Sequence, residues 1–148
     1  MKTKAKPENR PIEILLVEDS RGDATLMREI FKQSRFPIHL NVARDGEDAL
    51  AYLRQQEPFP QAPEPDIILL DLNLPKKDGR EVLEEIKRDS ALKHIPLLVL
   101  SASQDDADMR MAYENNANFY LVKPLRMDHF SVLLKYLEDF WIKTLPQE

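Results

Sequence analysis

The chain contains no cysteine, which excludes a disulfide framework, a thiolate metal site and a cysteine nucleophile. It also has no apolar run near the roughly 18–20 residues that a membrane-spanning helix needs, so we expect no membrane contact. Its net charge of −5 argues against a protein that coats nucleic acid. The basic start, residues 1–6, is not followed by the apolar segment of a signal peptide. We therefore expect residues 1–10 to form a flexible tail on a cytoplasmic protein.

The length and composition predict one globular domain. The chain has 148 residues, of which 43% are apolar and 32% are charged, so it is long enough to bury a full core and too apolar to be disordered. We expect this domain to span residues 11–148.

Short apolar runs alternate with longer stretches of helical period, a βαβα pattern that predicts a parallel sheet covered on both faces. The expected strands are Ile12–Glu18, Ile38–Arg44, Asp66–Asp71, Pro96–Ser101 and Phe119–Val122. The second of these alternates between apolar and polar residues, which is typical of an edge strand. The expected fold class is therefore α/β, a doubly wound five-stranded parallel sheet of order 2-1-3-4-5.

Five helices fit between and after the strands. They are expected over Arg21–Ser34, from about Asp45, over Gly79–Asp89, over Asp105–Asn115 and over Met127–Thr144. The spacing of Leu26, Met27, Ile30 and Phe31 predicts the buried face of the first helix, and Ser20 with Asp23 is spaced as a capping pair.

Polar side chains follow the strands at the points where they end. Glu18 and Asp19 follow the first, Asp71 ends the third, Ser101 ends the fourth and Lys123 follows the fifth. In the predicted strand order these ends meet at one edge of the sheet. Carboxylates crowded there need a counter-charge, and oxygen ligands suit Mg²⁺. The expected metal ligands are Asp19 and Asp71, with Glu18 acting through water and the carbonyl of Asn73 as a further ligand.

The same edge is equipped to accept a phosphoryl group. A carboxylate that attacks phosphorus forms an acyl phosphate, and the reaction needs charge neutralisation and in-line positioning more than acid–base help. Asp71 is the expected nucleophile. Lys123 would pair with one phosphoryl oxygen, and Ser101 would donate a hydrogen bond to another.

At these residues the chain resembles the receiver domain of two-component response regulators, a flavodoxin-like fold. The likeness covers about residues 11–140 and rests on residues 14–19, Asp71–Pro75 with Asp78–Gly79, Ser101–Ala102 and Lys123–Pro124. It implies that a sensor histidine kinase phosphorylates Asp71 with Mg²⁺ present, that hydrolysis follows, and that the Lys123–Pro124 bond is cis. The expected protein is a stand-alone receiver that catalyses only its own phosphorylation and dephosphorylation. Residues 72–83, the proline-rich loop before Asp66 and the late aromatic pair of the last helix also resemble regulators paired with bacterial phytochromes.

The resemblance also implies a switch and an output surface. Ser101 and Tyr120 are expected to move together on phosphorylation and to remodel the surface of the fourth helix, fifth strand and fifth helix. Phe130, Phe140 and Trp141 are candidates for a homodimer interface there, although packing on the sheet also explains the two aromatic residues at the end of that helix.

Three other interpretations remain open on the sequence. A magnesium-dependent phosphotransferase or phosphatase would use the same aspartyl phosphate, but Asn73 cannot supply the proton that such enzymes take two residues after the nucleophile. A flavin or nucleotide carrier would need an anion-binding first loop, which Glu18 and Asp19 oppose. A constitutive scaffold would not require Asp71, Ser101 and Lys123 together.

Overall fold

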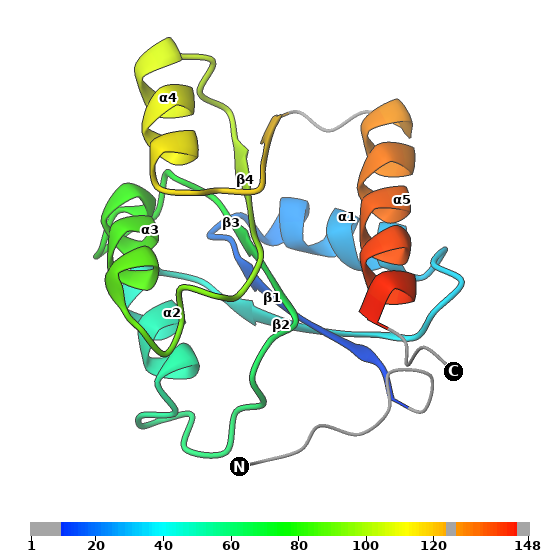
Figure 1. Ribbon diagram of the computed structural model, residues 1–148, viewed down its shortest axis with the longest axis horizontal. Helices are drawn as coiled ribbons and strands as arrows, with labels where there is room; N and C mark the ends of the chain where they lie inside the picture. Colours follow the sequence, from blue (N-terminus) through cyan, green and yellow to red (C-terminus); the bar gives the residue numbers. More distant parts are fainter. Residues whose placement is uncertain (1–9, 124–126, 145–148) are drawn as a thin grey trace.

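The computed structural model describes residues 10–123 and 127–144, and within the last helix it describes the side chains of residues 131–143. The described residues form a five-stranded parallel sheet of order β2-β1-β3-β4-β5, which confirms the predicted architecture (Figure 1). The strands are β1 (Ile12–Val17), β2 (Ile38–Ala43), β3 (Ile67–Leu70), β4 (Leu97–Ser101) and β5 (Phe119–Val122). The helices are α1 (Arg21–Phe31), α2 (Gly46–Leu53), α3 (Gly79–Arg88), α4 (Asp106–Glu114) and α5 (Met127–Thr144).

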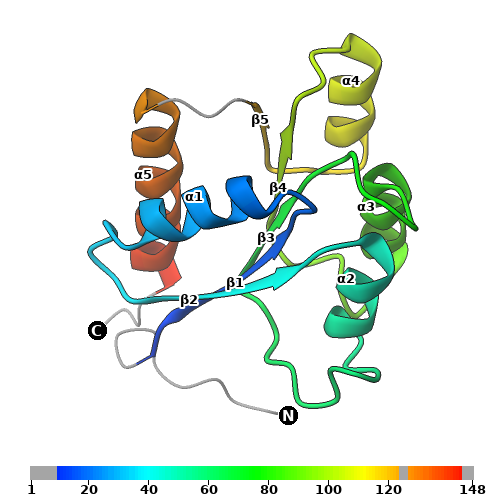
Figure 2. The ribbon, with the colours of Figure 1, turned by 180° about the vertical axis from the view of Figure 1, so that it is seen from behind.

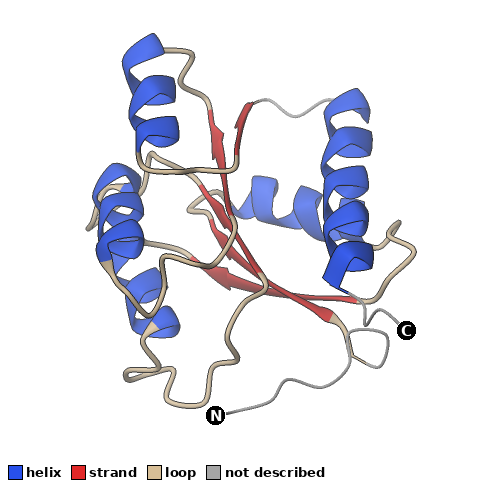
Figure 3. Ribbon diagram, in the orientation of Figure 1, coloured by secondary structure: helices blue, strands red, loops and turns tan. Residues whose placement is uncertain are grey.

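Helices cover both faces of the sheet, as the continuous burial of β3 and β4 requires. Helices α1 and α5 lie on one face, and α2, α3 and α4 lie on the other (Figures 2 and 3). Strand β2 lies at one end of the strand order and is only partly buried, which confirms it as an edge strand. Within the described ranges, no helix combines the length and the apolar character that crossing a bilayer requires.

The first helix differs from the prediction in two ways. It ends at Phe31, three residues before the predicted Ser34, and Leu26 is 42% exposed. Ala24 joins Met27, Ile30 and Phe31 in the buried face instead. Residues at positions i, i+3, i+4 and i+7 define a stripe, and Leu26 lies beside that stripe and not within it.

Two predictions fall on residues that are not described. The N-terminal tail was predicted for residues 1–10, of which only Arg10 is described, and the predicted cis bond involves Pro124. Both therefore stay predictions.

Candidate functional site

The parallel register brings the predicted site residues to one edge of the sheet. Val17 pairs with Leu70 across β1 and β3, so Glu18 and Asp71 leave their strands side by side. The backbone N–H of Asp71 donates to the carbonyl of Val17 at 3.0 Å. On the other side, the N–H of Lys123 donates to the carbonyl of Ser101 at 2.8 Å, which ties the end of β5 to the end of β4.

The ammonium group of Lys123 is the centre of the site. Its Nζ donates to Asp23 Oδ2 at 2.9 Å, to Asp71 Oδ2 at 3.1 Å and to Glu18 Oε1. The side chain of Lys123 is 13% exposed and that of Glu18 is 2% exposed. We call Lys123, Glu18, Asp23 and Asp71 the Lys123 cluster. With three carboxylates on one ammonium, the ionised cluster carries an excess of negative charge.

Burial and pairing pull the pKa values of this cluster in different directions. Burial raises the pKa of Glu18, although the hydrogen bond and charge of Lys123 oppose the shift. Burial alone would lower the pKa of Lys123, but its hydrogen bonds to Glu18 and Asp23 and the charge of Asp71 raise it above its ordinary value. Lys123 therefore keeps its positive charge, whereas Glu18 is the member of the cluster whose charged form is disfavoured by burial.

The carboxylate of Asp71 is held from two sides. Oδ1 accepts the backbone N–H of Asn73 at 3.0 Å, while Oδ2 faces Lys123. Behind it, Gly79 lies so close that a Cβ on this residue would stand 2.3 Å from the carbonyl oxygen of Asp71. Gly79 also donates its N–H to Leu72 at 2.9 Å. Only a glycine lets α3 begin this close to the loop that carries Asp71.

Ser101, at the end of β4, and Tyr120, in β5, both contact Ser103 in the loop after β4. The Ser101 side chain is fully buried, and its Oγ accepts the N–H of Ser103 at 3.1 Å. Tyr120 is 6% exposed and donates its hydroxyl to the carbonyl of Ser103 at 2.9 Å. The two residues predicted to switch together are therefore joined through one peptide segment, and the tyrosine ring is directed inward.

The structure adds Asp23 to the acidic residues around Lys123. Asp19 is exposed and is not among the partners of Lys123, whereas Asp23, from the first turn of α1, is. The predicted capping pair is half correct: the N–H of Asp23 donates to Ser20 Oγ at 3.1 Å, but its carboxylate reaches Lys123 instead of closing the cap. The sequence signal for this was the position of Asp23, one helical turn beyond the acidic pair.

The oxygen donors fit a hard divalent cation in their chemistry. The carboxylates of Glu18 and Asp71 already share one cation, Lys123 Nζ, and carboxylate oxygens are ligands that Mg²⁺ accepts. Among the described residues, no three His, Cys, Asp or Glu side chains form a ready-made metal site. The ligand set Glu18, Asp19, Asp71 and Asn73 therefore stays a prediction.

The interface candidates divide. Trp141 is 1% exposed and Phe140 packs against the core between α1, α5 and the sheet. Of the two explanations left open for Trp141, its burial supports packing on the sheet. The side chain of Phe130 lies outside the described residues. Exposed apolar side chains on α4 and α5 are Tyr113, Val132 and Ile142.

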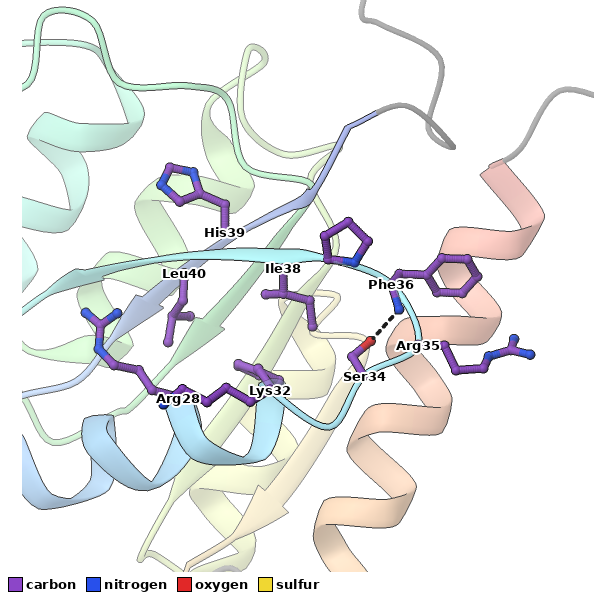
Figure 4. Close-up of a pocket in the computed structure, with 10 residues that line it drawn as sticks. Arg28, Lys32, Ser34, Arg35, Phe36, Ile38, His39 and Leu40 are labelled. Carbon is purple, nitrogen blue, oxygen red and sulfur yellow. Dashed lines mark hydrogen bonds between the residues drawn. The ribbon is translucent and has the colours of Figure 1, made fainter.

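Two pockets flank α1. One of about 260 Å³ adjoins the Lys123 cluster and is lined by Glu18, Asp23, Leu26, Met27, Leu100 and Lys123. The other, about 420 Å³, lies between the end of α1 and β2 (Figure 4). Of its basic side chains, Lys32 pairs with Glu29 and Arg35 with Glu138, and the His39 ring hydrogen-bonds to Glu13. Since none of its lining residues belongs to the Lys123 cluster, only the first pocket belongs to the candidate site.

The chain is similar to known proteins over most of its length. The family model described as the response regulator receiver domain matches residues 14–135. Response regulator Rcp1 of Synechocystis sp. is 45% identical over 137 residues, which are 93% of each protein. The crystal structure of its Mn²⁺-bound form has a TM-score of 0.81 at 46% identity and covers 93% of this chain and 100% of that one. The phosphorylated cyanobacterial phytochrome response regulator RcpA has a TM-score of 0.81 at 44% identity, with the same coverage.

Proposed function

Because the chain belongs to the response regulator receiver family, we propose that it signals by accepting a phosphoryl group on Asp71. The observation that carries the assignment is the contact of the Asp71 carboxylate with the Lys123 ammonium at 3.1 Å, with Lys123 also bonded through its backbone to the buried Ser101. A nucleophile, a cation and a hydroxyl donor from three neighbouring strands are the parts that phosphoryl transfer needs.

The reaction proceeds in two displacements. An oxygen of Asp71 attacks the phosphorus of a phosphohistidine, and the P–N bond breaks as the new P–O bond forms. The imidazole nitrogen keeps the electron pair of the broken bond. Lys123 then pairs with a phosphoryl oxygen in place of the Asp71 oxygen that has become part of the acyl phosphate. Water later attacks the same phosphorus, which releases inorganic phosphate and restores the Asp71 carboxylate.

Mg²⁺ is the proposed cofactor. It would be held by Asp19 and Asp71, with Glu18 acting through water and the carbonyl of Asn73 as a further ligand, and it would offset the negative charge that the phosphoryl group brings. A relative was solved in an Mn²⁺-bound form, which supports a divalent ion. We expect Mg²⁺ to raise the melting temperature of the wild type, because an ion that binds only the folded state stabilises that state. Asp19→Asn should reduce this shift, while Asp106→Asn, an exposed change on α4, should leave it intact.

The proposed partner is a sensor histidine kinase of the phytochrome type. The support is that RcpA, named as a phytochrome response regulator, matches over 93% of this chain. The test is transfer of labelled phosphate from such a kinase to this chain under light of two colours. A rate that does not depend on the colour of light would argue against the phytochrome partner, while leaving Asp71 as the acceptor.

The proposed output is a change in the surface of α4, β5 and α5 that favours a homodimer. Tyr113, Val132 and Ile142 leave apolar side chains exposed on α4 and α5, at 49%, 50% and 40%. Sedimentation with and without a phosphoryl analogue measures this directly. A monomer at all concentrations in both states would rule the dimer out, and association that survives Tyr120→Ala unchanged would remove the tyrosine from the switch.

The central experiment is incubation with Mg²⁺ and acetyl phosphate, followed by mass spectrometry. Wild type and Asp106→Asn should gain one phosphoryl group, and Asp71→Asn should gain none. Uptake by Asp71→Asn would overturn the assignment. Turnover of external phosphoesters beyond one equivalent would instead favour the alternative, a magnesium-dependent phosphotransferase or phosphatase.

A further inference from the structure

A second set of charged groups lies at the same edge of the sheet. Arg80, at the start of α3, forms two parallel hydrogen bonds with Asp108 on α4, Nε to Oδ1 at 2.7 Å and Nη2 to Oδ2 at 2.6 Å. The Ser103 hydroxyl donates to the same Asp108 Oδ2 at 2.6 Å. We call Arg80, Asp108 and Ser103 the Arg80 linkage. A forked guanidinium–carboxylate pair is directional and holds its partners in one orientation.

Ser103 carries this linkage into the phosphoryl-acceptor site. Its side chain is fixed at Asp108 and also accepts the N–H of Asp105 at 3.2 Å. Its backbone N–H donates to Ser101 Oγ at 3.1 Å. The position of the Ser103 peptide therefore decides how the Ser101 hydroxyl is held.

The Ser101 hydroxyl is buried with its hydrogen unused. A hydroxyl has one hydrogen and two lone pairs, and the Ser103 N–H occupies one lone pair. Among the described residues, none accepts the Ser101 hydrogen. Since the lone pair is fixed, the hydrogen is restricted to the remaining directions before a phosphoryl oxygen arrives. Such preorganisation lowers the barrier, because no reorganisation is needed at the moment of reaction.

Arg80 also contacts the other side of the site. Its Nη1 donates to Asp78 Oδ1 at 3.1 Å and lies 3.5 Å from the carbonyl of Leu72, the residue after Asp71. One guanidinium thus contacts the loop after β3 directly and the loop after β4 through Asp108. Asp108 stays ionised at neutral pH, since the bonds from Arg80 and then Ser103 lower its pKa to about 2.

We propose that Arg80 and Asp108 are positioning residues of the phosphoryl-acceptor site, and that they act through Ser103 on the Ser101 hydroxyl. This inference rests on the proposed function. Neither residue touches the phosphoryl group. Their role is to set the direction of the hydroxyl hydrogen relative to Asp71, so their loss slows the chemical step without weakening binding of the phosphodonor.

The test measures the rate of phosphoryl uptake as a function of acetyl phosphate concentration at fixed Mg²⁺. Asp108→Asn and Arg80→Gln should each lower the maximal rate about tenfold, equivalent to about 1.4 kcal/mol of transition-state stabilisation. The half-saturating concentration should not change. The double variant should be no slower than either single one, because both break the same linkage.

Two further comparisons separate positioning from general structural support. Ser103→Ala should be as slow as Asp108→Asn, whereas Ser103→Thr, which keeps the hydroxyl, should retain the wild-type rate. Arg54→Gln is the matched control. Arg54, at the end of α2, forms ion pairs with Glu85 and Asp89 of the α3 segment, and its side chain is 34% exposed, against 32% for Arg80. It should leave the rate unchanged.

Each outcome decides something. A wild-type rate in Asp108→Asn overturns the inference, and so does equal slowing in Arg54→Gln. If Asp108→Asn fails to fold, the Ala and Thr variants at Ser103 decide: equal rates for these two overturn the proposal. If the wild type itself takes up no phosphoryl group, the proposed function fails, and this result is separate from all the others.

Discussion

The Lys123 cluster and the Arg80 linkage lie at the same edge of the sheet but are balanced differently. In the first, three carboxylates share one nearly buried ammonium, and burial raises the pKa of Glu18. In the second, one guanidinium faces one main carboxylate in a fork, and the pKa of Asp108 falls to about 2. A cluster with excess charge gains by taking up another cation or exchanging partners, whereas a balanced pair gains by staying as it is. The difference separates the part of the site that reacts from the part that holds it in place.

The largest expected effect is that of Lys123→Met. Removing the ammonium leaves the carboxylates of Glu18 and Asp71 unpaired in a buried site, which costs about 3–5 kcal/mol of unfolding free energy at pH 7. The pKa of Glu18 is already raised in the folded state and should rise further. A raised folded pKa contributes stability at low pH that is lost as the pH rises through it. The deficit should therefore be smaller at pH 5 than at pH 7, as measured by urea denaturation.

The control for this change is Lys32→Met. Lys32 is 71% exposed and, within the described part of the chain, pairs only with Glu29, so its loss should change the unfolding free energy by no more than about 0.5 kcal/mol. If Lys123→Met were as stable as wild type at pH 7, or if its deficit grew on acidification, the distinction between the two charged groups would be lost.

The next effect concerns Gly79, which lies between the two groups. In Gly79→Ala the new Cβ would stand 2.3 Å from the Asp71 carbonyl and 2.5 Å from Leu72 Cα. Since both are backbone atoms, the loop must shift, at a cost of about 1–3 kcal/mol. Phosphoryl uptake should slow with it. Gly22→Ala is the matched control, because its nearest neighbour is Ser20 Oγ at 3.8 Å, and it should gain up to about 1 kcal/mol. Equal stability of the two variants would contradict this account.

The smallest expected effect is that of Arg80→Met, about 1 kcal/mol, because the pair is partly exposed. Its pH dependence lies in a lower pH range than that of Lys123→Met. The lowered pKa of Asp108 contributes stability above the ordinary carboxyl value of 3.8, and this is lost as the pH falls toward about 2. The deficit of the variant should be constant from pH 5 to 8 and should shrink only below about pH 4. Denaturation at four pH values checks this, and a deficit that already shrinks at pH 6 would contradict it.

The sequence predicted the sheet well because the strands have a clear apolar pattern. Runs such as Ile67–Leu70 are apolar throughout, and each is followed by a polar residue, so the carboxyl edge of the sheet could be located from the sequence pattern alone. The strand order then placed Glu18, Asp71, Ser101 and Lys123 at one edge, and the structure brings Glu18 and Asp71 onto Lys123.

What the sequence could not supply is the rotation of individual helices and contacts between distant segments. Periodicity identified the apolar stripes of α1 and α5 but not their limits, so Leu26 was assigned to the core, and Trp141 was left open between an interface and packing on the sheet. The bond between Arg80 and Asp108 joins residues 28 positions apart on different helices, and no local pattern marks it. Asp23 was interpreted as part of a cap because its spacing from Ser20 is a local pattern. Its contact with Lys123 depends on the whole fold and leaves no local pattern.

The backbone bond from Lys123 to the Ser101 carbonyl has a mechanical consequence. This bond joins the two residues that carry the ammonium and the hydroxyl, so a displacement of the end of β4 also displaces the end of β5. A movement that brings Ser101 toward a newly attached phosphate therefore also moves Lys123, and the two groups approach the phosphate together.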